Sequence, residues 1–277
     1  AAMEVQDVAS LSKAQLQALT TAQTVALTTD QLVALRPVQV SQLSVQSMTA
    51  LTTNQVSVLS TAQMVALGTA QVAALTSGQW AVATTTQVAS LKSGQLAAIE
   101  TADLAGLTDE HMTALLRSQV TAFTTDQIQA LSTTQMAAVS ASAFSALTAA
   151  QVKVLTTDQV AGLTTDQVAA MTNAQVAAMT TDAVKALTTD AVVALTTAQV
   201  KSLTATQAAA MTTDQIAAIE TDDVQMLSTN QLVALTTSQV QAMTTDQLVA
   251  LSTGQIASME TTDVAAMTTD QLVALTS

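Results

Sequence analysis

An eight-residue repeat runs through the whole 277-residue chain without an insertion or a deletion. Counting in eights from Met3 to Leu275, all 35 positions are apolar, and most of them are Leu or Met. We call these positions the leucine class. A second class, the valine class, runs from Val8 to Leu272 and is apolar at every position except Thr24. A repeat this strict indicates an array in which each unit packs against its neighbours.

Each octad also carries the signals that start a helix. In the octad that begins at Thr156, this residue is suited to be the N-cap and Gln159 to be the third helical residue. The two form a capping box, in which the Thr hydroxyl accepts from the Gln amide and the Gln side chain reaches back to the Thr amide. Leu155 and Val160 can pack together as a hydrophobic staple, and Asp158 lies where the helix dipole favours negative charge. The pattern is general: Ser or Thr occupies 27 of the 35 positions in this cap class (residues 4 to 276), and Gln 25 of the 34 positions in the glutamine class (residues 7 to 271).

The residues that usually break helices fall where this register tolerates them. Pro37, the one proline, takes the position after the cap, which becomes the first helical residue and is the position that proline suits best. Gly68 takes a cap position, where glycine is also acceptable. Both placements support the helical interpretation.

The spacing leaves room for helices of only five to seven residues, about two turns each. Helices this short are not stable alone, because isolated ones are marginal below about 12–15 residues. We therefore predict an all-α solenoid of very short helices, stable only because neighbouring octads pack together. No linker interrupts the register, so we expect residues 1–277 to form one continuous array, either a segment of a longer one or a fibre subunit.

Two other architectures fit the repeat less well but stay open. A β-solenoid would need alternating polar and apolar residues, whereas the octads contain runs such as Val-Ala-Ala-Leu. One unbroken helix would rotate its apolar stripe by about 80° in each octad, and no simple partner could follow that stripe.

The composition argues against several functions. The net charge of −13 disfavours nucleic-acid binding, and every octad is too polar for a membrane span of about 18 apolar residues. The chain has no Cys and one His, so thiolate chemistry is excluded and no catalytic set stands out. His111 lies in the glutamine class and is expected to be a surface or capping residue. We predict no enzymatic activity and no cofactor, and the pattern identifies no small-molecule ligand.

Acidic residues form one unusual pattern. Wherever the cap class is Glu, the glutamine class is Asp, and this pairing occurs four times: Glu4 with Asp7, Glu100 with Asp103, Glu220 with Asp223, and Glu260 with Asp263. We expect the two positions of each pair to interact across the helix start, either in a different cap that uses the next Thr or around a bound Ca²⁺. The candidate Ca²⁺ ligands are Glu100, Asp103, Glu220, Asp222, Asp223, Glu260 and Asp263.

The runs LTTDQVAGLTTDQVAAM and LTTAQVKSLTATQAAAM resemble octapeptide tracts of large bacterial secreted or surface proteins, which are described as adhesin-like or structural. The resemblance implies a non-enzymatic protein at the cell surface or outside the cell: a stalk, a spacer or a self-assembling fibre subunit. End-to-end or side-by-side self-association is expected, because both ends stop in register with apolar surfaces. The alternatives are a module that binds Ca²⁺, glycans or ice, the last two through the row of threonines after the caps, and a cytosolic scaffold for partner helices.

Overall fold

The computed structural model describes residues 3–275, and it is all-helical over that range, with no strand. It contains 33 α-helices and one 3₁₀ helix, η1, and each has four to six residues. The prediction of an array of very short helices is therefore confirmed, with helices slightly shorter than expected. None of the helices among residues 3–275 has the length and apolar character needed to cross a membrane.

The chain divides into two compact units, Ala1–Ala146 and Leu147–Ser277. The helices of the first unit are α1 (Val5–Ala9), α2 (Lys13–Gln17), α3 (Thr21–Ala26), α4 (Thr29–Ala34), α5 (Pro37–Val40), α6 (Val45–Ala50), α7 (Thr53–Ser57), α8 (Thr61–Ala66), α9 (Thr69–Ala73), α10 (Ser77–Trp80), α11 (Thr85–Ala89), α12 (Ser93–Leu96), η1 (Thr101–Gly106), α13 (Asp109–Thr113), α14 (Arg117–Val120), α15 (Thr125–Ala130), α16 (Thr133–Ala138) and α17 (Ala141–Phe144).

The helices of the second unit are α18 (Ala149–Lys153), α19 (Thr157–Ala161), α20 (Thr165–Ala170), α21 (Asn173–Ala178), α22 (Thr181–Ala186), α23 (Thr189–Val193), α24 (Thr197–Ser202), α25 (Ala205–Ala210), α26 (Thr213–Ala218), α27 (Thr221–Val224), α28 (Thr229–Val233), α29 (Thr237–Ala242), α30 (Thr245–Ala250), α31 (Thr253–Ser258), α32 (Thr261–Ala266) and α33 (Thr269–Ala274). The repeat register continues in the sequence from one unit into the next, and a single array over residues 1–277 stays a prediction.

Two extended residues separate successive helices at a typical corner. Between α3 and α4, Leu27 has φ −62° and ψ 133°, and the cap Thr28 has φ −72° and ψ 160°. None of the described residues has a positive φ. The corner therefore needs no glycine, which explains how an octad made of Leu, Thr, Gln and Ala can turn the chain every eight residues.

The caps have the geometry that the sequence predicts. The Thr156 amide donates to Oε1 of Gln159 at 2.9 Å, and the Gln159 amide donates to the Thr156 hydroxyl at 3.2 Å. Pro37 is the first residue of α5, and Gly68 is the N-cap of α9, as expected.

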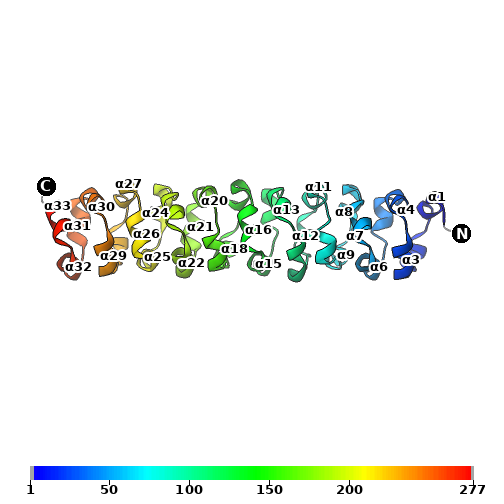
Figure 1. The fold of residues 1–277 in the computed structure, drawn as a ribbon, viewed down its shortest axis with the longest axis horizontal. Helices are drawn as coiled ribbons and strands as arrows, with labels where there is room; N and C mark the ends of the chain where they lie inside the picture. Colours follow the sequence, from blue (N-terminus) through cyan, green and yellow to red (C-terminus); the bar gives the residue numbers. More distant parts are fainter. Residues whose placement is uncertain (1–2, 276–277) are drawn as a thin grey trace. The chain divides into compact units, whose positions relative to one another are not determined.

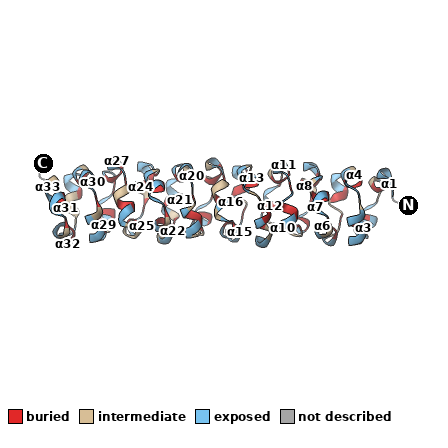
Figure 2. Cartoon of the chain, in the orientation of Figure 1, coloured by how far each residue is buried: buried red, intermediate tan, exposed pale blue. Residues whose placement is uncertain are grey.

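Within each unit, helices pack against the third helix after them in the chain. Examples are α1 with α4, α3 with α6, and α29 with α32 (Figure 1). Buried and exposed residues alternate along the chain of each unit (Figure 2). The leucine and valine classes are mostly buried, with exceptions near the ends such as Met3, Val264 and Leu272, and the residues after the caps are mostly exposed. Trp80 and Phe144 are the largest fully buried side chains, and both belong to the valine class.

The 3₁₀ helix η1 marks a close approach of two segments in the first unit. Gly106 is buried against the backbone of Ser77, the first residue of α10. A Cβ atom added to Gly106 would lie 2.7 Å from the carbonyl carbon of Ser77 and closer still to its oxygen. Only glycine allows this contact, because real Cβ atoms are not found at such distances.

Candidate functional site

The buried glutamines connect successive turns of the array. Gln55 is 3% exposed, and its Oε1 accepts from the amide of the cap Thr52 at 2.8 Å. Its Nε2 donates to two main-chain carbonyls at the end of α3, those of Leu27 at 2.8 Å and Thr24 at 2.9 Å. One side-chain amide thus caps its own helix and also binds the segment 28 to 31 residues earlier, so all of its hydrogen-bonding groups are satisfied.

The same bridge recurs in both units. We call this set of buried glutamines the glutamine ladder. The Nε2 atom of each donates to the leucine-class carbonyl 28 residues earlier, three and a half octads back, at 2.6–3.0 Å. The residues that make this bond are Gln31, Gln39, Gln55, Gln63, Gln71, Gln79, Gln87, Gln95, Gln119, Gln127 and Gln135 in the first unit, and Gln175, Gln199, Gln207, Gln215, Gln231, Gln239, Gln247, Gln255 and Gln271 in the second.

The octad pattern predicts the capping half of this arrangement but not the bridging half. One signal for the bridge was present. Glu serves a capping box as well as Gln does, yet no position of the glutamine class is Glu. A carboxylate could accept from the cap amide but could not donate to a carbonyl, so the strict choice of Gln indicates that a donor is needed.

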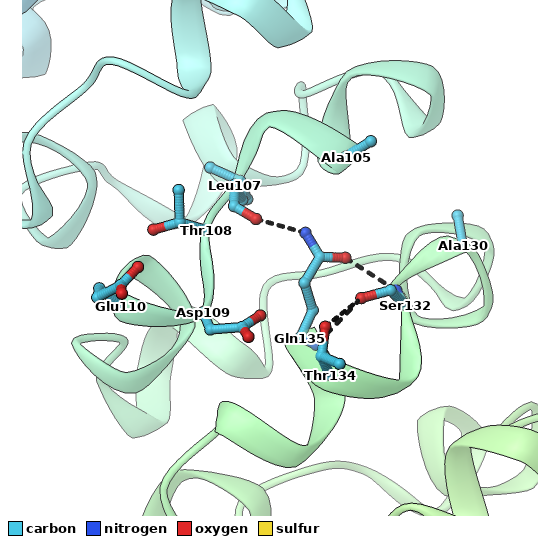
Figure 3. Close-up of a pocket in the computed structure, with 9 residues that line it drawn as sticks. All are labelled: Ala105, Leu107, Thr108, Asp109, Glu110, Ala130, Ser132, Thr134 and Gln135. Carbon is cyan, nitrogen blue, oxygen red and sulfur yellow. Dashed lines mark hydrogen bonds between the residues drawn. The ribbon is translucent and has the colours of Figure 1, made fainter.

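A surface hollow beside Gln135 shows one bridge in detail (Figure 3). The Ser132 amide donates to Oε1 of Gln135 at 2.8 Å, and Nε2 of Gln135 donates to the Leu107 carbonyl at 2.6 Å. The hollow has a volume of about 450 Å³, with Asp109 and Glu110 on one side and the Ser132 segment on the other. The polar groups of the bridge thus hydrogen-bond to one another at the wall of the hollow.

Folding lowers the pKa of Glu110, which lines this hollow. The hydroxyl of Thr108 hydrogen-bonds to its carboxylate and holds the pKa of Glu110 below its ordinary value. Its own backbone amide acts on the pKa in the same direction, and burial acts against both hydrogen bonds. Glu110 is solvent-exposed, so this effect is local.

His111 replaces glutamine in the ladder. Its Nδ1 accepts from the Thr108 amide at 3.0 Å, and its Nε2 lies 2.7 Å from the Ala83 carbonyl, 28 residues earlier. Since a main-chain amide can only donate and a carbonyl can only accept, the neutral ring carries its proton on Nε2. His111 is buried and caps its helix, so it takes the capping role that the sequence predicts.

The paired acidic residues do not all interact as expected. At Glu4 and Asp7, the Glu4 amide donates to the Asp7 carboxylate at 3.3 Å across the helix start. At Glu100, Glu220 and Glu260, the cap side chain makes no capping hydrogen bond.

Two of the aspartates in these pairs instead reach the helix three before their own. Asp103 accepts from the Ser77 amide at 2.7 Å, and Asp263 accepts from the Thr237 hydroxyl at 2.9 Å. Both partners are 26 residues earlier and are the first residue of their helix. The reason is chemical: a carboxylate can only accept, so it binds donors at a helix start, whereas the glutamine amide binds carbonyls at a helix end.

The candidate Ca²⁺ ligands are only partly brought together. Glu220 and Asp222 line one hollow of about 470 Å³ together with Asp246, which is not among the predicted ligands. Asp223 is buried and does not line it. Among residues 3–275, no three His, Cys, Asp or Glu side chains are placed to hold a metal ion, and Ca²⁺ binding stays a prediction.

Comparison with known proteins identifies the repeat. The ALTTAQ repeat model matches eight segments, most of which overlap another, and together they cover about three quarters of the chain: residues 1–37, 40–77, 48–85, 133–165, 142–173, 163–197, 216–253 and 246–277. No curated protein matches the chain. Since these matches cover more than half of the chain, the chain belongs to the ALTTAQ repeat family.

Proposed function

We propose that this chain is a non-enzymatic structural protein, a stalk or spacer outside a bacterial cell or the subunit of an extracellular fibre. The observation that carries the proposal is the glutamine ladder. Its amides are buried and hydrogen-bonded within the array, at its own caps and carbonyls. The glutamines, which are the side chains that vary least between octads, therefore join one turn of the array to the next.

The glutamine ladder suits a spacer because its hydrogen bonds do not depend on which side chains the neighbouring turn carries. Each bridge binds main-chain carbonyls, which every residue has, so any octad with a Gln can follow any other. The stability of such an array is approximately the sum of the intrinsic stability of each repeat and the free energy of its contacts with neighbouring repeats. Octads can therefore be added or removed in evolution to change the length while the fold is kept.

Removing whole octads tests the spacer role. Deletion of residues 156–187 removes four octads and joins Leu155 to Thr188 in register. We expect a folded chain with unchanged helicity per residue and a shorter maximum dimension in small-angle X-ray scattering. The matched control deletes residues 156–183, which is 28 residues and breaks the register, and should lose helicity and stability. Equal behaviour of the two deletions would contradict the proposal.

The extracellular location is supported by the resemblance to surface proteins and is tested in the producing cells. An epitope tag fused after the last residue of the chain, which leaves the octad register intact, should be labelled by antibody on intact cells. Labelling that requires permeabilised cells would favour the alternative of a cytosolic scaffold. The same labelling on a strain without the gene is the control.

A further inference from the structure

Two consecutive octads of the second unit lack a ladder glutamine. Ala183 in α22 and Ala191 in α23 occupy the glutamine class there, and both are buried, at 2% and 1% exposed. Alanine has no polar side-chain atom, so neither residue can hold a cap amide or donate to a carbonyl. Nowhere else in the sequence do two consecutive positions of this class lack a side-chain donor.

The carbonyls that these two bridges would bind are left without donors. A ladder glutamine at position 183 would donate to the carbonyl of Leu155, and one at position 191 to that of Leu163, 28 residues earlier in each case. Within residues 3–275, no hydrogen-bond donor reaches either carbonyl, although both leucines are buried. The corners after α18 and α19 therefore contact the following turn without a glutamine bridge.

The caps of α22 and α23 are also incomplete. The hydroxyls of Thr180 and Thr188 accept from the amides of Ala183 and Ala191 at 3.1 Å, as in other octads. The amides of the two threonines, which a glutamine Oε1 holds elsewhere, have no acceptor in the part of the chain that the structure describes. Each of the two helices thus keeps only one half of its capping box.

The array is bridged on both sides of this gap, and its apolar packing continues through it. Nε2 of Gln175 donates to the Leu147 carbonyl at 2.8 Å, and Nε2 of Gln199 donates to the Met171 carbonyl at 2.7 Å. The valine-class residues of α22 and α23 are at most 1% exposed. Two hydrogen-bonded links are therefore missing within an otherwise regular apolar core.

We propose that α22 and α23 form a joint, at which the array opens locally while the turns on either side stay bridged. Proteins open where the free-energy cost is lowest, and missing buried hydrogen bonds lower that cost. Apolar contacts are non-directional, so the two helices can separate from the corners after α18 and α19 and close again. The joint goes beyond the proposed structural role, because it gives an array under tension a defined place to yield.

Hydrogen exchange of the full chain, followed by mass spectrometry, tests the joint. The comparison is with α25 and α26, where Gln207 and Gln215 donate to the carbonyls of Met179 and Leu187 at 2.8 and 2.7 Å. After correction for intrinsic exchange rates, the amides of α22 and α23 should be protected roughly tenfold or more weakly than those of α25 and α26. A tenfold ratio corresponds to about 1.4 kcal/mol, near the net contribution of one or two hydrogen bonds.

Three paired variants identify the cause. Ala183→Gln with Ala191→Gln supplies both bridges and should raise the protection of α22 and α23 roughly tenfold or more. Ala183→Glu with Ala191→Glu supplies the cap acceptors without the bridging donors, so it should not restore protection. The matched control, Ala169→Gln with Ala177→Gln, makes the same change at two exposed positions outside the ladder and should leave protection unchanged.

The reverse change does not depend on fitting a larger side chain into the core. Gln207→Ala with Gln215→Ala removes two consecutive bridges and should produce a second joint, with weakly protected amides in α25 and α26. Circular dichroism verifies that every variant folds. If the Gln pair at 183 and 191 fails to fold, the wild-type pattern and this reverse change decide the question.

Three results would overturn the joint. The first is a wild type in which α22 and α23 are protected as strongly as α25 and α26. The second is a folded Glu pair that restores protection as fully as the Gln pair, which would assign the weakness to the caps. The third is a reverse change that leaves α25 and α26 fully protected. The in-register deletion tests the spacer role separately, so the failure of one proposal leaves the other standing.

Discussion

Nε2 of Gln79 lies 2.7 Å from the carbonyl oxygen of Leu51, a residue 28 positions earlier in the chain. The same amide group accepts from the amide of Thr76 at 2.8 Å through its Oε1. Gln79 is 3% exposed, so loss of the side chain would leave buried polar groups without partners. The stability of each turn therefore depends on one side chain that acts both locally and across turns.

Replacing Gln79 with Ala should lower the free energy of unfolding by about 1–3 kcal/mol, because the Leu51 carbonyl and the Thr76 amide lose their partner. Urea unfolding followed by circular dichroism measures the change. The control is Gln129→Ala, at an exposed position, which should stay within about 0.5 kcal/mol of the wild type. Equal effects at the two positions would show that the bridge contributes nothing.

His111→Gln should preserve stability, because the Gln amide supplies the same acceptor and donor as the neutral ring, whereas His111→Ala should cost about 1–3 kcal/mol. The ¹⁵N chemical shifts of the wild-type ring should show the tautomer with the proton on Nε2. A ring that is protonated on Nδ1 instead would contradict the assigned hydrogen bonds.

Gly106→Ala should destabilise the first unit by about 1–3 kcal/mol, because the added Cβ would overlap the backbone of Ser77. The control is Gly94→Ala, where an added Cβ has no neighbour within 4 Å. That substitution should raise stability slightly, by up to about 1 kcal/mol, because it lies within helix α12. Thermal unfolding of the two variants side by side gives the comparison.

Trp80, the only tryptophan, should show blue-shifted fluorescence that acrylamide quenches poorly. Its side chain is fully buried, and among residues 3–275 its indole nitrogen is the buried polar side-chain atom without a hydrogen-bond partner. Its emission should move to longer wavelength as the first unit unfolds in urea. Emission typical of an exposed indole in the native protein would contradict this packing.

The pKa of Glu110 should be below its ordinary value in an NMR titration, and Thr108→Val should raise it by removing the hydroxyl donor. Thr108→Ser keeps the hydroxyl and should leave the pKa low. A carboxyl whose pKa is lowered by folding contributes stability above its unfolded-state pKa. That contribution is present at neutral pH and is lost in acid, as the pH falls through the folded-state value.

The short helices, their caps and the apolar interior could be predicted from the sequence because their causes are local. A capping box joins residues three apart, and a staple joins residues five apart. The roles of Thr156, Gln159 and Val160 can therefore be recognised from the residues next to them in the sequence. Pro37 could be placed at a helix start for the same reason. These features require no knowledge of which octads lie side by side.

The bridges between turns were decided only by the tertiary structure. Nε2 of Gln55 finds the Leu27 carbonyl because the winding of the chain brings together segments 28 residues apart. That separation is not a whole number of octads, so the eight-residue period could not reveal it. The hydrogen bond between Asp263 and Thr237 could not be predicted for the same reason, since the two residues lie close together only after the helices have packed. Local hydrogen bonds determine where each helix begins, while the packing of the octads determines which carbonyl or hydroxyl each side chain meets.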